Sequence, residues 1–213
     1  MVIRIVECAR SYANRRDFIV DLHGTHIDVT VTANAYVVKK WITSTLYLRR
    51  QELHHLVVGL GVQWTPGWRE TPADTLQLCV GRRCLIFQLA YADYVPNVLR
   101  RFLSDNRFTF VGFYNHSDRL KLMISKHRLE MARDPLDLRF YAESEDEESL
   151  KFASVEEIVK ECLGFDGVRL RREISMSNWD VEFLSDDQVL QACLDAHCAF
   201  EIGKNIGAWR IST

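Results

Sequence analysis

The chain has 213 residues, of which 47% are hydrophobic and 26% are charged. This is the composition of one ordinary globular domain, and no apolar run is long enough for a membrane span or a signal peptide. The net charge of −2 excludes a global positive field that would attract nucleic acid, so such binding depends on local patches. We therefore expect an intracellular protein, in the nucleus or the cytoplasm, with no membrane contact.

The six cysteines show no metal-binding spacing. None forms a Cys-x-x-Cys pair, and most lie inside apolar segments. This pattern favours buried, reduced thiols over a structural zinc site or disulfides. The cysteines are Cys8, Cys79, Cys84, Cys162, Cys193 and Cys198.

The first 52 residues are predicted to form an N-terminal extension, a hairpin plus a helix, that packs on the rest of the domain. Residues 1–16 are mixed and basic, which is typical of an irregular lead. Residues 18–32 hold two strand-like stretches with Gly24 between them, which predicts a β-hairpin. Residues 36–48 place their apolar side chains on one side of a helix.

Residues 53–213 are predicted to form one α/β domain. Residues 56–64 are a short β-branched run that stops at a Pro and a Gly, which is typical of a buried strand. Strands at 75–80 and 84–89 complete an antiparallel meander, and the acidic run 143–148 is typical of a solvated loop. The order predicts a mixed α/β sheet covered by helices. The other predicted elements are helices at 95–103, 118–124, 154–163 and 185–202, and strands at 108–113 and 136–141.

Three segments resemble the sequence motifs of a known family. Residues 57–64 resemble its first motif, residues 110–122 its second, and residues 177–196 its third, which includes Ser-Asn-Trp-Asp. The family comprises 3′-5′ exonucleases with a ribonuclease-H-like (DnaQ-like) fold, whose metal ligands spell Asp-Glu-Asp-Asp. The likeness is greatest to the exonuclease domain of the Werner syndrome helicase and its plant relatives. It covers roughly residues 53–205 and implies the same fold here.

In that family, four carboxylates hold two divalent metal ions, Mg²⁺ or Mn²⁺, and a tyrosine orients the attacking water. Carried over position by position, the resemblance places Asp118 and Asp195 at the last two carboxylates. Gly61 and Gln63 stand where the family has its first aspartate and its glutamate, and Gln191 stands at the tyrosine position. The resemblance thus implies a site that keeps its surroundings and loses half of its charge.

This loss of charge predicts weak metal binding. We expect Mg²⁺ or Mn²⁺ to be held weakly on Asp118 and Asp195, or not at all, and a water would lack its usual base. The same residues also fit structural roles. Gly61 permits close packing, and Asp118 caps the helix that follows it. Gln63 and Gln191 hydrogen-bond each other across the former metal site, which would satisfy two buried amides.

Nucleic-acid contacts are predicted at both ends of the likeness. Arg171 and Arg172 lie where the family has basic residues near its substrate groove, and we expect them to contact phosphates. Trp64 and Trp68 are candidates for stacking on a base, with packing as an equal alternative.

Three functions therefore stay open. The favoured one is a degenerate exonuclease-like domain that binds DNA or RNA 3′ ends with weak or no cleavage. The second is an active metal-dependent 3′-5′ exonuclease with an atypical site built on Asp118 and Asp195. The third is a structural or regulatory partner of active relatives, which self-associates into a homo-oligomer through the edge of the N-terminal hairpin.

Overall fold

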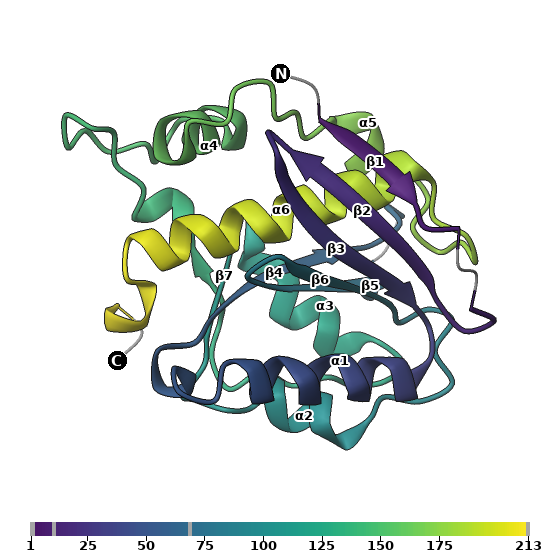
Figure 1. Cartoon of the computed structure of the whole chain (residues 1–213). Coiled ribbons are helices and arrows are strands. Elements are labelled where there is room, and N and C mark those ends of the chain that lie inside the picture. The colour runs from purple at the N-terminus through teal and green to yellow at the C-terminus, as the bar shows by residue number, and fades with distance from the viewer. Residues whose placement is uncertain (1–2, 10–11, 68–69, 212–213) are drawn as a thin grey trace.

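Eight strands form one sheet, in the order β1-β2-β3-β6-β5-β4-β7-β8 (Figure 1). The structure is a computed structural model, and it describes residues 3–9, 12–67 and 70–211. The strands are β1 (Arg4–Glu7), β2 (Arg16–Leu22), β3 (Thr25–Thr32), β4 (Val57–Gln63), β5 (Thr75–Val80), β6 (Arg83–Gln88), β7 (Thr109–Gly112) and β8 (Leu136–Asp137).

The centre of the sheet is the predicted antiparallel meander β4-β5-β6. β4 also pairs in parallel with β7, and β7 pairs in parallel with β8. The carboxyl ends of β4, β7 and β8 therefore lie along the same edge of the sheet. In open α/β sheets this is the edge at which ligands bind. The predicted mixed α/β fold is confirmed.

Helices cover both faces of the sheet. The helix α6 lies across β4, β5, β6 and β7, while α1, α2 and α3 lie on the opposite face (Figure 1). Because both faces are covered, β4 reads as a continuous apolar run in which only Gln63 is not fully buried. The α-helices are α1 (Ala35–Leu48), α2 (Asn97–Leu103), α3 (Asp118–Ile124), α4 (Val155–Leu163), α5 (Arg172–Ser175) and α6 (Asp186–Asn205).

Two predicted helix starts are confirmed in atomic detail. Ser154 and Ser185 each accept a hydrogen bond from the third helical residue, whose side chain accepts one in return, so both helices begin with a capping box. The predicted end of α6 at Gly203 is wrong, because the helix continues to Asn205. Gly203 serves close packing instead, since a Cβ there would come within 2.9 Å of the Val111 side chain.

The N-terminal lead is more ordered than predicted. Residues 4–7 are the strand β1, which pairs antiparallel with β2. The hairpin of β2 and β3 is confirmed, but β1 covers one of its edges and β6 pairs in parallel with the other. The predicted assembly through a free hairpin edge is therefore wrong, and β1 is the outer strand. β3, which precedes residue 52, belongs to the same sheet as β4, which follows it. The predicted domain boundary after residue 52 stays a prediction.

The predicted strand 136–141 is mostly wrong. Only Leu136–Asp137 pairs with β7, and Leu138–Phe140 form a 3₁₀ turn. The Asp137 side chain accepts a hydrogen bond from the backbone N–H of Arg139 at 3.2 Å. Such a local bond competes with strand pairing and ends β8.

Four of the six cysteines are buried, as expected for thiols in apolar segments, while Cys8 and Cys162 are partly exposed. Among the described helices, none is both long and apolar enough to cross a membrane.

Candidate functional site

The close approach of α6 to β4 brings the predicted site residues together. A Cβ on Gly59 would overlap the carbonyl oxygen of Ala196, so the two backbones touch where glycine leaves room. Two residues further along β4, a Cβ on Gly61 would lie 3.2 Å from Oδ2 of Asp195. The structure thus places the position of the first predicted carboxylate directly beside the last.

Gln77, which none of the three motifs includes, also faces this point. A Cβ on Gly61 would lie 2.8 Å from Oε1 of Gln77, which is directly opposite on β5. The amide nitrogen donates a hydrogen bond to Oγ1 of Thr75 at 2.6 Å, while Oε1 is buried and has no hydrogen-bond partner among the described residues. The signal in the sequence was one polar residue between Leu76 and Leu78 in an apolar strand.

Asp118 is the first residue of α3 and is only 4% exposed. Burial raises the pKa of its carboxyl well above the usual range, and the charges of Asp195 and Asp137 raise it further. No capping hydrogen bond from the side chain before α3 is formed, and Ser117 is the cap residue. The predicted capping role of Asp118 is therefore wrong, and Asp137 joins the group of acids.

Asp195 lies in the middle of α6. Burial of its carboxyl raises its pKa to about 7, and Cys84 adds a smaller contribution. The charge of Asp195 is in turn one of the causes that raise the pKa of Asp118. Near neutral pH the pair therefore carries less negative charge than two exposed carboxylates would.

The side-chain amide of Gln191 is bonded to residues at α5. Its amide nitrogen donates to Oγ of Ser175 at 2.7 Å and to the carbonyl oxygen of Arg171 at 3.2 Å. The predicted hydrogen bond between Gln63 and Gln191 is not formed. The reason is the short helix α5, which brings two acceptors to Gln191 and was not predicted.

Thr65 ties the third predicted motif to the end of β4. Its hydroxyl donates to the Asp74 carboxylate at 2.7 Å and accepts the backbone N–H groups of Trp179 and Asp180 at 2.9 Å each. Gln188 of α6 donates its amide to the carbonyl oxygen of Asn178 at 2.8 Å. These hydrogen bonds therefore hold the segment between α5 and α6 beside the site.

Two proteins are similar to the chain in sequence. The mimivirus protein R431 (Acanthamoeba polyphaga mimivirus), named as a 3′-5′ exonuclease, is 23% identical over 184 residues, which are 83% of this chain and 45% of that protein. The mouse bifunctional 3′-5′ exonuclease/ATP-dependent helicase WRN is 28% identical over 161 residues, which are 71% of this chain and 11% of that protein. The chain thus spans less than half of the length of either relative. No model of a known protein family matches it.

Solved structures share the fold. The EXO domain of Aedes aegypti Nibbler matches with a TM-score of 0.62 at 16% identity, covering 85% of this chain and 88% of that one. Escherichia coli RNase D matches with a TM-score of 0.58 at 15% identity, covering 76% and 42%. The chain is thus similar in fold to these exonuclease domains and is distantly similar in sequence to two proteins named as 3′-5′ exonucleases. The matches also include the EXD2 exonuclease domain soaked in Mn and Mg, at 23% identity, a TM-score of 0.43 and coverage of 86% and 92%.

The metal pair of a DEDD-type site does not fit the residues present here. Gly61 has no side chain, and Gln63 offers a neutral amide. In the part of the chain that the structure describes, no three His, Cys, Asp or Glu side chains are arranged to hold a metal ion. Burial raises the pKa values of both acids that remain, Asp118 and Asp195.

The side chains predicted to contact nucleic acid are not equally free to bind a ligand. Arg171 forms an ion pair with Asp187 at 2.5 Å, while Arg172 is exposed at the start of α5. Trp64 follows β4 directly, and Nζ of Lys121 lies 4.8 Å from the centre of its ring. Trp68 lies outside the described residues. Arg172 and Trp64 therefore remain the better candidates.

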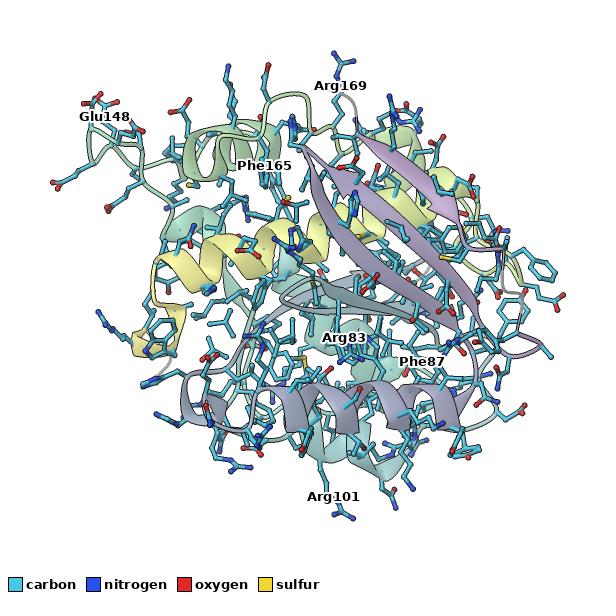
Figure 2. All side chains as sticks on the ribbon, in the orientation of Figure 1. Arg83, Phe87, Arg101, Glu148, Phe165 and Arg169 are labelled. Carbon is cyan, nitrogen blue, oxygen red and sulfur yellow. The ribbon has the colours of Figure 1, made fainter. Side chains whose placement is uncertain are left out.

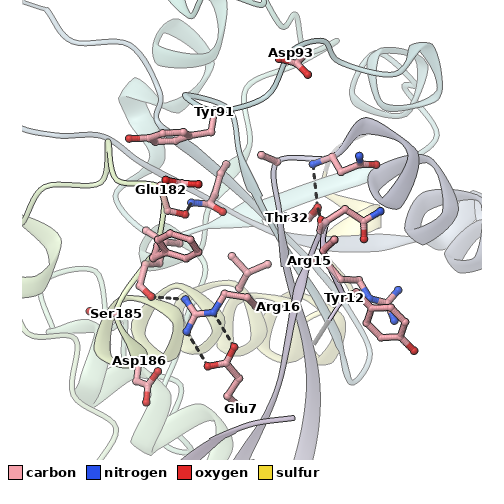
Figure 3. A pocket seen from close by; sticks show the side chains of 18 residues that line it. Glu7, Tyr12, Arg15, Arg16, Thr32, Tyr91, Asp93, Glu182, Ser185 and Asp186 are labelled. Atoms are coloured by element: carbon pink, nitrogen blue, oxygen red, sulfur yellow. Dashed lines mark hydrogen bonds and ion pairs between the residues drawn. The ribbon is translucent and has the colours of Figure 1, made fainter. Parts of the chain in front are cut away.

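A separate groove of about 790 Å³ lies near the carboxyl ends of β3 and β6 (Figure 3). In the sheet, these two strands lie on the side of β5 that is away from β4. Its Arg16 forms an ion pair with Glu7 at 2.8 Å and donates to the carbonyl oxygen of Leu184 at 2.8 Å. None of the predicted site residues lines it. Its further acids are unfavourable for phosphates; they are Asp93, Glu182 and Asp186.

Proposed function

We propose that the chain is a DEDD-type exonuclease-like domain that binds the 3′ ends of DNA or RNA and cleaves them weakly or not at all. The observation that carries this proposal is the closeness of Gly61 to Asp195, whose Oδ2 would lie 3.2 Å from a Cβ at position 61. The family has its first aspartate at this position. Here the residue is a glycine, so the position offers no charged side chain. The family mechanism requires a metal ion at that point.

The two remaining acids support the same proposal. Cation binding requires ionised carboxylates, and the pKa values of Asp118 and Asp195 are both raised. Gln191 stands at the position of the family tyrosine, and its amide nitrogen donates hydrogen bonds to Arg171 and Ser175 at α5. A water in this site would thus lack both an activating metal pair and a base.

Binding is supported by the surroundings of the site. Trp64 follows β4 at the carboxyl edge of β4, β7 and β8, and it suits stacking on a base. Arg172 is exposed at the start of α5, which is bonded to Gln191 of α6, and it suits a phosphate. RNase D is named as an exoribonuclease involved in structured RNA processing, and WRN as a 3′-5′ exonuclease. We extend nucleic-acid binding, DNA and RNA alike, from these relatives to this chain.

The test uses an end-labelled duplex with a recessed 3′ end, in Mg²⁺ or Mn²⁺, beside the variant Asp118→Asn/Asp195→Asn. We expect the wild type to shift the duplex in a gel without a 3′-to-5′ product ladder. A ladder that the double variant lacks would overturn the proposal. Absence of both the shift and the ladder would also overturn it and would direct the search to protein partners.

A second candidate function is cleavage at a reduced site. The buried, unpartnered Oε1 of Gln77 offers one neutral oxygen beside the Asp195 carboxylate, which together suit a single, weakly held Mg²⁺ or Mn²⁺. The ladder described above would favour this candidate, and Gln77→Leu would then abolish it.

A third candidate is self-association into a homo-oligomer. The outer strand β1 has a row of exposed residues, among which Val6 is 63% exposed, and such an edge is a template for strand pairing. A monomer in a sizing column at high protein concentration would remove this candidate.

A further inference from the structure

Five side chains form a continuous ladder of alternating rings and cations. The guanidinium of Arg139 lies 3.6 Å from the ring centre of Tyr114 and 5.5 Å from that of Phe140. The ammonium of Lys151 lies 5.1 Å from the ring centre of Phe140 and 5.6 Å from that of Phe152. Two of these contacts join residues far apart in the chain, so the fold assembles the ladder.

The rings of the ladder are open to solvent. Tyr114 is 50% exposed, Phe140 is 53% exposed and Phe152 is 94% exposed. Aromatic side chains usually bury most of their surface. Three exposed rings in one connected row are therefore a surface that a ligand with flat, apolar faces would cover.

The ladder begins beside the candidate site. Tyr114 follows the carboxyl end of β7, and Arg139 follows the carboxyl end of β8. Asp137, which pairs with Arg139 at 2.6 Å, is also one of the acids that raise the pKa of Asp118. The row thus starts at the edge of the sheet that carries Asp118 and leads away from it.

The first two rungs have distinct local geometry. Tyr114 has φ = 51° and ψ = 30°, a left-handed conformation that is rare for an aromatic residue. The carboxylate of Asp137 accepts hydrogen bonds from Nε and Nη2 of Arg139 at 3.0 and 2.6 Å. This ion pair fixes the guanidinium plane against the Tyr114 ring and neutralises its charge.

We propose that this ladder is a track for single-stranded nucleic acid, along which successive bases stack on Tyr114, Phe140 and Phe152. Every base has an apolar face, so stacking of this kind tolerates any sequence. Lys151, between two of the rings, supplies a cation for the backbone. The inference rests on the proposed function, since it names the strand that leads to the same site.

The acidic run marks the far end of the track. Residues 143–148 form a loop that projects from the body of the protein, with Glu148 near its tip (Figure 2). Glu145, Asp146, Glu147 and Glu148 are all exposed. Their charges repel phosphates, so a bound strand would leave the surface near Phe152 instead of following the loop.

The test measures binding of a fluorescein-labelled strand of about 12 thymidines by fluorescence anisotropy. The variants are Phe140→Ala and Phe152→Ala, and the matched control is Phe183→Ala, a phenylalanine that is 69% exposed and lies just before α6. We expect each ladder variant to weaken binding about tenfold, which corresponds to the stacking of one base. Phe152→Trp should retain the affinity, and the control should match the wild type.

The experiment separates a failure of the track from a failure of the proposed function. Equal affinity of the wild type and both ladder variants would overturn the track and leave the proposed function standing. No binding by the wild type, to this strand or to the recessed duplex, would overturn both. Phe152 packs so little surface in the protein that Phe152→Ala should keep the thermal stability of the wild type, so loss of fold does not explain a loss of binding.

Discussion

Gly61 lies so close to Asp195 that a Cβ at position 61 would stand 3.2 Å from Oδ2 of the aspartate. In a DEDD-type site two carboxylates would face each other here across a metal ion. The two positions lie this close because Gly59 lets α6 approach β4. Position 61 has no side chain that could supply the second carboxylate. The close approach of the backbone is therefore present without the charge.

Two neighbouring glycines should therefore respond differently to the same change. Gly59→Ala should lower the free energy of unfolding by about 3 kcal/mol or more, since its methyl group meets the rigid backbone of Ala196. Gly61→Ala should cost less than about 1 kcal/mol, since the Gln77 side chain can turn away. Urea unfolding of the two variants measures the difference. Equal losses would contradict the close approach described here.

Restoring the missing carboxylates should restore a metal site. In Gly61→Asp/Gln63→Glu, the new acids repel Asp195 when a chelator is present, and Mn²⁺ relieves that repulsion. We expect Mn²⁺ at about 100 times its Kd to add about 2.7 kcal/mol of stability, a rise in Tm of several degrees. The neutral variant Gly61→Asn is the matched control. The same response in both variants would show that the correspondence to the family motif is misplaced.

The raised pKa of Asp195 predicts a pH-dependent stability. Its folded-state pKa is about 7, above the value near 3.9 of an unfolded aspartate. The folded state therefore holds the proton longer, and the free energy of unfolding falls as the pH rises from about 4 to about 7, by on the order of 1 kcal/mol per unit. Asp195→Asn cannot titrate, so it should gain stability relative to the wild type across this range. Denaturation midpoints in a chelating buffer measure the gain.

His197 makes the comparison with a variant necessary. Burial lowers its pKa to about 4, below the unfolded value near 6.5, so its contribution to stability rises with pH between these two values. It opposes the Asp195 contribution over most of the same range. Because both proteins contain His197, its effect cancels in the difference between the wild type and Asp195→Asn. Parallel curves for the two proteins would contradict the shift at Asp195.

Thr65→Val should loosen the segment between α5 and α6. The change removes one hydroxyl that serves Asp74, Trp179 and Asp180, and buried groups left unpaired cost about 1–3 kcal/mol. We expect a loss of that size in urea unfolding, with faster hydrogen exchange at Trp179. Thr65→Ser keeps the hydroxyl and should retain most of the stability. A neutral Thr65→Val would mean that water replaces the hydroxyl.

Most of the fold could be predicted because its patterns are local. The apolar run of β4 and the capping boxes at Ser154 and Ser185 depend on near neighbours in the sequence. The errors arose where a distant contact decided the outcome. Gly203 resembles a helix stop until Val111 is placed beside it, and residues 138–140 alternate like a strand until Asp137 bonds to the next turn.

Less of the site could be predicted. The motifs placed Gly61 and Asp195 at corresponding positions, but nothing in the sequence says that Gln77 faces them from β5. The partner of Gln191 was missed because α5 has only four residues and no periodic pattern. Strand register and short helices bring these groups together, and both depend on the folded sheet.

The central claim is that the site holds no metal pair, and titration of the wild type with Mn²⁺ tests it most directly. Calorimetry or the paramagnetic signal of the ion would count bound Mn²⁺, with Asp118→Asn/Asp195→Asn as the reference. We expect both proteins to bind Mn²⁺ equally weakly, with no pair of ions assigned to the site. Two ions bound to the wild type and lost from the double variant would contradict it.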